Sequence, residues 1–207
     1  IDMEKFTQHD IKLGYVPQPF QQPHPPVAVS AMSPHSDSLG FAGSRGYIPV
    51  TANFIAAWSA QTHWPTYVAA AKAAGQATDP AIWRVARSVY VADTDAEAEA
   101  FVKKSEGAYD YYYQYLFKIF DRSNYKAPFV ANLGDDPDKL TAEGVRDACI
   151  IHGSPETVAR KVLALRDQIG DFGTLLYAAH DWQDKAAMKK SMSLMATEVM
   201  PRINQAI

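Results

Sequence analysis

Cysteine is almost absent from this chain: Cys149 is the only one among 207 residues. One thiol excludes an intramolecular disulfide and any metal site made of several cysteines. Because Cys149 stands in the apolar run 148–151, we expect a small buried side chain there rather than a nucleophile. The scarcity of cysteine favours a protein of the reducing cytoplasm.

A strong excess of charge of either sign is also missing. The chain carries 20 Lys and Arg against 23 Asp and Glu, a net charge of −3, and its basic residues are scattered. Such a surface gives no attractive field for a phosphate backbone, so we expect no nucleic-acid partner. No apolar run reaches the roughly 18 residues of a membrane span, and no signal-like segment opens the chain. We therefore expect neither membrane insertion nor export.

The spacing of histidines lacks any metal-binding pattern. The six histidines include no His-x-His pair and no pair four residues apart. Such pairs would place two ring nitrogens on one face of a strand or helix, where a metal ion binds both. We expect no metal site.

What the chain does contain is an alternation of apolar strands and helices. Its apolar fraction of 47% is enough for the core of one domain. Residues 1–26 hold five prolines and predict an extended connector. After the connector the pattern predicts strands at 27–32, 47–51, 83–91 and 174–179, separated by helices at 37–45, 54–74, 95–120 and from Ser154, with a last helix through Met200.

Strands joined by helices must lie parallel, because a parallel connection needs a long crossover. The fold class is therefore α/β, either a doubly wound sheet or part of a (β/α)₈ barrel. A complete barrel needs eight strands and about 250 residues. If the fold is a barrel, the four predicted strands make this chain one half of it, the half that contains strands five to eight. Half a barrel leaves open strand edges, which require a partner.

Three segments carry further expectations. Pro65 predicts a kink or break near His63 in the helix 54–74. The helix 95–120 carries seven tyrosines and phenylalanines between Tyr109 and Phe120 that face all round it. Part of this cluster must therefore pack outside one core, in a second packing surface, a subunit contact or a ligand pocket. The polar segment 121–147 predicts an insertion loop.

The most informative segment is the strand 27–32 with the serine-rich turn that follows it. Ser33, Ser36 and Ser38 stand where the strand gives way to a helix. The first turn of a helix has unpaired N–H groups and the positive end of the helix dipole, and it binds phosphate. The alternative is that one serine only caps the helix. Ser154, followed by Pro155, has the same two interpretations, and capping is sufficient there.

Several motifs in this order resemble one known family, over about 21–203. They are Gln21-Gln22-Pro23-His24-Pro25-Pro26, Ser33-Pro34-His35-Ser36, Ala42-Gly43-Ser44-Arg45-Gly46, Val91-Ala92-Asp93-Thr94-Asp95-Ala96-Glu97-Ala98, Gly153-Ser154-Pro155-Glu156-Thr157-Val158, and Gly173-Thr174-Leu175 with Ala179-His180-Asp181-Trp182. Together they resemble the carboxyl-terminal half of bacterial-luciferase-like, flavin-dependent monooxygenases, and among these the limonene and diketocamphane monooxygenases.

The resemblance implies a (β/α)₈ barrel in a cytoplasmic enzyme, often a homodimer. Such an enzyme takes reduced FMN from a separate flavin reductase. Reaction with O₂ gives a peroxyflavin that inserts one oxygen atom into a small hydrophobic substrate, and the cofactor carries the difficult chemistry. A deazaflavin in place of FMN stays open. The resemblance also implies that the amino-terminal half of the barrel is a missing partner, so that the chain is expected to be a truncated or nicked product that could be inactive alone.

The site residues follow by position from the resemblance. The turn after the fifth strand implies contacts to FMN from Ala31, Met32, Ser33, His35 and Ser36, and the turn after the sixth strand implies Asn53 near the flavin ring. Met32 stands where luciferase has an acidic residue, so backbone contacts transfer better than side-chain contacts. His180, after the eighth strand, is the catalytic candidate, with a purely structural histidine as the alternative.

Two other functions remain open from the sequence. The first is a flavin-binding protein without turnover. The second is a flavin-free barrel enzyme that acts on a phosphorylated substrate.

Overall fold

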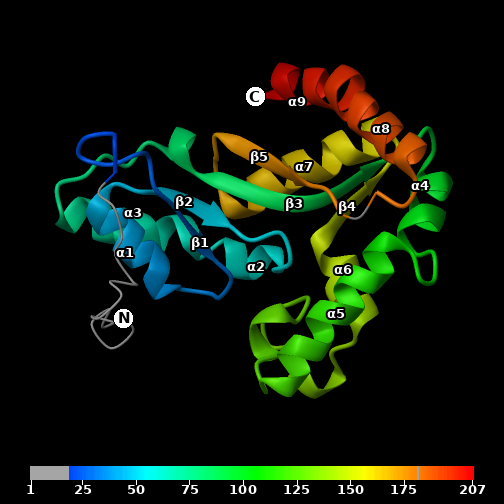
Figure 1. Cartoon of the computed structure of the whole chain (residues 1–207), viewed down its shortest axis with the longest axis horizontal. Coiled ribbons are helices and arrows are strands. Elements are labelled where there is room, and N and C mark those ends of the chain that lie inside the picture. The colour runs from blue at the N-terminus through cyan, green and yellow to red at the C-terminus, as the bar shows by residue number, and fades with distance from the viewer. Residues whose placement is uncertain (1–18, 181) are drawn as a thin grey trace, which may run out of the picture.

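The computed structural model describes residues 19–180 and 182–207 as a parallel sheet with helices on its outer side (Figure 1). The strands are β1 (Ala28–Ala31), β2 (Ile48–Thr51), β3 (Arg84–Val91), β4 (Ile150–Gly153) and β5 (Thr174–Ala178). The helices are α1 (Asp37–Arg45), α2 (Ala57–Ala60), α3 (His63–Ala73), α4 (Asp95–Val102), α5 (Ala108–Arg122), α6 (Ala142–Cys149), α7 (Pro155–Ile169), α8 (Lys185–Leu194), the π-helical η5 (Met195–Val199) and α9 (Met200–Ala206). Short 3₁₀ turns are η2 (Pro80–Ile82), η3 (Ala127–Phe129) and η4 (Pro137–Lys139).

All strand pairs are parallel, which confirms the predicted α/β class. The strand β3 is central, because Ser88 pairs with Ile150 of β4 on one edge and with Ala178 of β5 on the other. The strand β2 pairs with the first residues of β3, so β4 lies beyond β2 on the same edge. The strand β4 was not predicted, because its four residues, Ile-Ile-His-Gly, are too few to give a readable alternation.

The register separates an outer face of the sheet from an inner one. Ala31, Thr51 and Val85 form one row across β1, β2 and β3, and all three are buried beneath the helices. The neighbouring row, Ser30 and Val50 with Arg84 and Thr174, is half-buried or exposed. Parallel sheets are normally covered on both faces. The sheet is therefore arranged as part of a barrel with its interior side open.

Helices α1 and α3 cover the outer face at β1 and β2 through a small core of Leu39, Ala42, Tyr67 and Ala71. They approach so closely that a Cβ atom on Gly43 would lie 2.3 Å from the carbonyl oxygen of Tyr67. Helix α1 ends at Gly46, which has the left-handed conformation expected of a helix-terminating glycine. The helix predicted over 37–45 is confirmed with both its boundaries.

The predicted helix 95–120 is wrong, because the chain breaks it into α4 and α5. Glu106 has a φ of +57°, and the backbone N–H of Glu106 donates to the carboxylate of Asp110. Gly107 then starts α5. The predicted break in the helix 54–74 is confirmed: α2 ends at Ala60, α3 starts at His63, and Pro65 lies in the first turn of α3.

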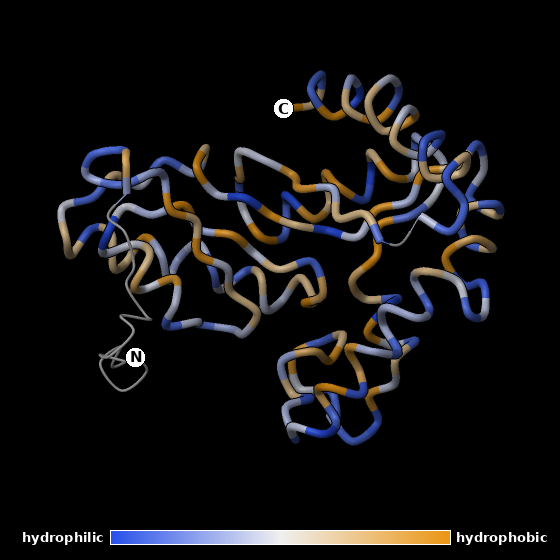
Figure 2. Tube along the Cα trace, in the orientation of Figure 1, coloured by the Kyte–Doolittle hydropathy of each residue, from blue (hydrophilic) through white to orange (hydrophobic). Residues whose placement is uncertain are grey.

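The predicted loop 121–147 is shorter than expected. Helix α5 continues to Arg122, and α6 begins at Ala142. Figure 1 shows α5 and α6 projecting from the sheet as a lobe. Phe120 and Phe129 stack within it with ring centroids 3.5 Å apart. The composition is polar because most residues between these elements are exposed, although the buried apolar residues of the lobe join the main core of the sheet (Figure 2).

The connector predicted over 1–26 lies only partly within the described residues. Residues 20–26 are exposed and form no helix or strand, whereas 1–18 lie outside the described part. Across the residues that are described, no helix combines the length and apolar character that crossing a membrane would require.

Candidate flavin-phosphate turn and His180 cluster

A hollow of about 650 Å³ opens at the carboxyl ends of β1 and β2, beside the amino-terminal part of β3. In α/β barrels, this end of the strands carries the active site. The hollow is lined by residues of β1 and β2, of the segments that follow these two strands, and of β3: Ser30, Ala31, Met32, Ser33, Ser36, Ser38, Val50, Ala52, Asn53, Phe54 and Ala86. Five of the seven predicted site residues are therefore brought together at one place.

The turn between β1 and α1 leaves the start of the helix open to a ligand. Ser36 occupies the N-cap position, but its side chain makes no capping hydrogen bond to the helix. The Ser36 hydroxyl lies 2.8 Å from that of Ser38, whose own hydrogen bonds the carbonyl of Ser30 at 3.0 Å. The capping alternative is therefore wrong for Ser36. The start of α1 therefore lies beside the hollow with the hydroxyls of Ser36 and Ser38 next to it, an arrangement that suits an anion.

His35 does not line the hollow. Its backbone is left-handed, with a φ of +52°, and its side chain is exposed. Its backbone N–H donates to the Thr62 hydroxyl at 2.8 Å. His35 therefore shapes the turn through its main chain, and the structure brings its ring to none of the other predicted residues.

A buried histidine that the sequence did not single out holds this turn in place. His63, at the start of α3, is fully buried, and its Nε2 donates to the Ser33 carbonyl at 3.0 Å. Its Nδ1 lies 3.0 Å from the Thr51 hydroxyl, which also accepts the indole N–H of Trp83 at 2.9 Å. Burial lowers the pKa of His63 to about 4. The ring is therefore neutral at pH 7 and ties β1, β2 and β3 together.

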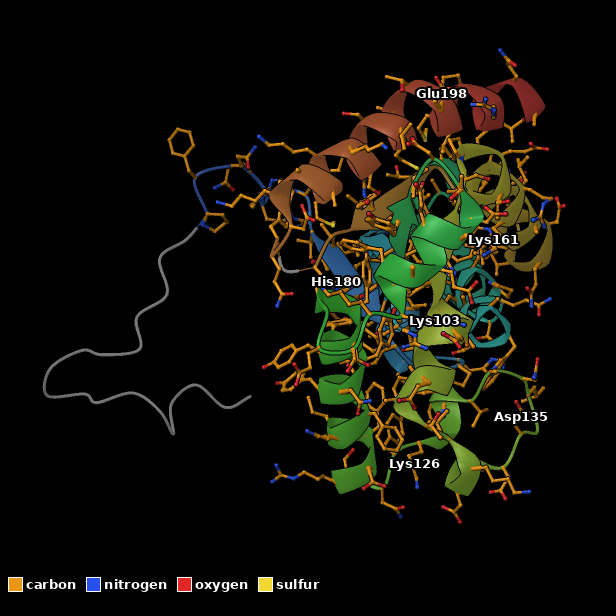
Figure 3. All side chains as sticks on the ribbon, turned by 90° about the vertical axis from the view of Figure 1, so that its right-hand side faces the viewer. Lys103, Lys126, Asp135, Lys161, His180 and Glu198 are labelled. Atoms are coloured by element: carbon orange, nitrogen blue, oxygen red, sulfur yellow. The ribbon has the colours of Figure 1, made fainter. Side chains whose placement is uncertain are left out.

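The second part of the site surrounds His180, which follows β5. Its Nε2 lies 2.8 Å from the hydroxyl of Ser88 on β3. Three rings of α5 pack round it, and the closest is Tyr112, with ring centroids 4.1 Å apart. Figure 3 shows His180 at the amino-terminal end of α5. Burial lowers the pKa of His180 to about 4, so this ring too is neutral at pH 7.

Asn53 connects the two parts. It lines the hollow, and its amide nitrogen donates to the Ser88 hydroxyl at 3.0 Å and to the Tyr112 hydroxyl at 3.2 Å. The predicted residues Asn53 and His180 thus meet through Ser88, which sequence reasoning missed. The only available signal was one polar residue in the apolar half of the strand 83–91. Asp181, which belongs to a motif quoted above, lies outside the described residues.

The aromatic cluster of α5 divides as the sequence required. Tyr109, Tyr113 and Phe120 are buried, whereas Tyr111 and Tyr115 are exposed. The hydroxyl of Tyr109 donates to the Val89 carbonyl at 2.9 Å. Helix α5 therefore both packs into the core and contributes side chains to the polar cluster around His180.

The start of α7 is filled by the protein itself. The backbone N–H of Ser154 donates to the carboxylate of Asp95 at 2.6 Å, and the hydroxyl of Thr157 donates to the same carboxylate at 2.9 Å. These bonds, first of all the one from the Ser154 backbone, lower the pKa of Asp95. The Ser154 hydroxyl also caps the helix as predicted. The Asp95 carboxylate thus accepts the hydrogen bonds that a phosphate at this helix would need.

Cys149 is buried, as predicted, and burial raises the pKa of its thiol to about 12. Within the described ranges, no three side chains of His, Cys, Asp or Glu gather as a metal site would need.

Comparison with known proteins gives consistent relatives. The family model for luciferase-like monooxygenases matches residues 4–171. The chain is 35% identical to 3,6-diketocamphane 1,6-monooxygenase of Pseudomonas putida over 86% of this chain and 47% of that protein. It is 28% identical to limonene 1,2-monooxygenase of Rhodococcus erythropolis over 86% of this chain and 43% of that protein.

Solved structures agree with these relatives. The oxygenating constituent of 3,6-diketocamphane monooxygenase from Pseudomonas putida, a type II Baeyer-Villiger monooxygenase solved in complex with FMN, superposes with a TM-score of 0.76 and 35% identity over 87% of this chain and 49% of that one. The chain spans about half the length of the curated relatives it matches.

Proposed function

The chain belongs to the luciferase-like monooxygenase family, and from that premise we propose that it is the carboxyl-terminal half of the barrel of an FMN-dependent monooxygenase. In this proposal the hollow at β1, β2 and β3 receives reduced FMN. A separate reductase supplies the reduced flavin, and the substrate is small and hydrophobic. Bound reduced flavin would supply the activation of O₂ and the transfer of one oxygen atom.

The open start of α1 carries the proposal. FMN ends in a phosphate, and a phosphate needs N–H donors, hydroxyls and positive potential, all of which this turn offers. Ser33, Ser36 and Ser38 would surround the phosphate. The residues lining the hollow include no acidic side chain, and Asp37, which stands between Ser36 and Ser38, is exposed in the first turn of α1. The residues present therefore fit the group.

The remaining residues of the site would exclude water and orient the two reactants. Asn53 extends from the hollow toward Ser88, so it would lie between the flavin ring and His180. His180 would hydrogen-bond the substrate or the flavin from the side of β5. The uncovered inner face of the sheet would be closed by an amino-terminal half-barrel that provides strands one to four, and a homodimer of complete barrels is the proposed assembly.

The variant Ser36→Asp tests the phosphate position. Asp is as good an N-cap residue as Ser, so the stability of α1 should be kept, whereas a carboxylate beside the phosphate should repel it. We expect FMN, titrated by its fluorescence, to bind the wild-type chain and to bind the variant at least tenfold more weakly, with an unchanged melting temperature. Thr94→Asp is the matched control: it makes the same kind of change at the N-cap of α4, which does not line the hollow.

Riboflavin completes this experiment, because it lacks the phosphate. It should bind more weakly than FMN and equally to the wild type and to Ser36→Asp. Equal affinity of the wild-type chain for FMN and riboflavin, or no binding of FMN at all, would overturn the phosphate assignment.

Turnover is tested on a fusion in which the amino-terminal half of 3,6-diketocamphane 1,6-monooxygenase precedes this chain. With chemically reduced FMN, O₂ and a panel of cyclic terpenoids, mass spectrometry should detect a product that has gained one oxygen atom. A fusion that binds FMN and oxygenates no member of the panel would favour a flavin-binding role without turnover.

A further inference from the structure

The hydroxyl of Ser88 has more partners than a hydroxyl can donate to. It lies 3.0 Å from the amide nitrogen of Asn53, 3.0 Å from the hydroxyl of Tyr113 and 2.8 Å from Nε2 of His180. A hydroxyl has one hydrogen to donate and two lone pairs that accept. Three simultaneous bonds therefore require that two of these partners donate to Ser88 and that one accepts from it.

Two of the partners are donors. An amide nitrogen can only donate, so Asn53 gives a hydrogen to Ser88. Tyr113 is buried, and within the described residues its hydroxyl makes no other hydrogen bond, so its hydrogen would be left unpaired if it did not donate to Ser88. Both lone pairs of Ser88 are then occupied. Its own hydrogen must go to His180 Nε2.

The proton of the neutral imidazole therefore sits on the other nitrogen. A ring nitrogen that accepts a hydrogen bond carries no proton, and a neutral imidazole has one N–H group. That group is Nδ1–H. Nδ1 makes no hydrogen bond to any described residue, and His180 is only partly buried, so the N–H group is available to a ligand.

We propose that Asn53, Ser88 and Tyr113 are positioning residues that fix His180 as the Nδ1–H tautomer, so that it donates a hydrogen bond to a neutral oxygen acceptor, such as a carbonyl, on the substrate. The role toward a substrate rests on the proposed function; the tautomer does not. His180 is then a donor that orients a carbonyl compound, and not a general base. A substrate without an oxygen acceptor would gain nothing from it.

A second neutral histidine, His63, provides an internal reference for the tautomer of His180. His63 is also neutral and buried, but its Nε2 faces the Ser33 carbonyl, which can only accept. Its Nδ1 faces the hydroxyl of Thr51, whose oxygen already accepts from Trp83. His63 must therefore be the Nε2–H tautomer. The two histidines should differ in one spectrum of one sample.

Two-bond ¹H–¹⁵N correlation spectroscopy on the uniformly ¹⁵N-labelled chain at pH 7 distinguishes these tautomers. The signals of His180 and His63 are assigned by their loss in His180→Gln and His63→Gln. We expect a protonated Nδ1 and an unprotonated Nε2 for His180, and the reverse for His63. Protonated Nε2 on His180 would overturn the proposal, whether or not the chain binds FMN.

Two variants then test whether Asn53 and Ser88 determine the tautomer of His180. Asn53→Asp replaces the donor by a carboxylate that accepts from Ser88, so Ser88 must accept from His180 and the proton should move to Nε2. Ser88→Ala should leave His180 a mixture of both tautomers. The signals of His63 should stay unchanged in both variants. A His180 spectrum that neither variant alters would contradict the role of Asn53 and Ser88, and the wild-type spectrum still decides the tautomer if one variant fails to fold.

Discussion

Single side chains set the site through burial more than through charge. His63 and His180 are both neutral at pH 7 because desolvation penalises the imidazolium, and each makes its hydrogen bonds as a neutral ring. His63 acts on the backbone of the serine turn between β1 and α1, and His180 lies in the cluster with Ser88. A neutral donor binds an oxygen atom without the cost of burying an unpaired charge.

The pH dependence of stability follows from His63. Its pKa is about 4 in the folded chain and 6.5 as a free side chain, so the unfolded chain binds the proton more strongly. The stabilisation is complete above pH 6.5 and is lost as the pH falls toward 4, with a total of about 3 kcal/mol from this residue.

Urea unfolding at pH 7 and pH 4.5 measures this dependence. The wild type should lose stability between the two values, and His63→Gln, which has no titrating ring, should lose less. His24→Gln is the control, because His24 is exposed, and it should behave as the wild type does. Equal losses in His63→Gln and the wild type would contradict the prediction.

The helices are placed by close backbone contacts as much as by their apolar faces. Gly43 allows α1 to lie directly against α3, and the left-handed Glu106 followed by Gly107 redirects the chain from α4 into α5. The capping box of Thr94 and Glu97 fixes the start of α4, where Asp95 reaches the start of α7. These contacts decide where the tyrosines of α5 meet His180.

Two glycines of α1 give opposite expectations for the same substitution. In Gly43→Ala the new methyl group would overlap the Tyr67 carbonyl, which is backbone and cannot turn away, so we expect a loss of more than about 2 kcal/mol. A Cβ on Gly40 would meet nothing within 4 Å. Gly40→Ala should therefore gain about 0.5–1 kcal/mol, since alanine favours the helix.

Chemical denaturation of the two variants and the wild type gives these differences directly. A Gly43→Ala chain as stable as the wild type would mean that α1 and α3 lie further apart than described. The positive effect of Gly40→Ala guards against a general loss of stability caused by any change in α1.

Sequence reasoning was most successful for elements and least successful for contacts between them. The four predicted strands, the limits of α1 and the cap at Ser154 depend on patterns formed by residues that are neighbours along the chain. The break at Glu106 and the strand β4 escaped, because nothing local distinguishes them. His63 and Ser88 escaped for another reason: their partners lie far along the chain.

At the scale of the whole molecule, the strands of the sheet differ in how many of their edges are paired. The strand β3 is paired on both edges, whereas β1 and β5 each have one partner among the described residues. The side chains of Ser30, Val50, Arg84 and Thr174, which form one row on the inner face, remain half-buried or exposed. An amino-terminal half-barrel would cover this face and pair with both edges.

Amide hydrogen exchange tests this view of the molecule. In the chain alone, the amides of β3 should exchange more slowly than those of β1, because β1 is paired on one edge and open on its inner face. In the fusion with an amino-terminal half, protection should rise at β1 and β5 and change little at β3. Equal protection of β1 and β3 in the chain alone would contradict the open edge.

The sequence by itself determined the class of the fold, four of the five described strands and the position of the serine turn at the end of β1. Those features depend on periodicity, caps and turn residues, which act over a few neighbouring positions. Only the tertiary structure decided that Ser36 does not cap its helix, that His63 holds the turn, and that Asn53, Tyr113 and His180 meet at Ser88. The reason is physical: a hydrogen bond between residues 25 to 92 positions apart forms only when the fold brings their elements together, and no local pattern encodes that approach.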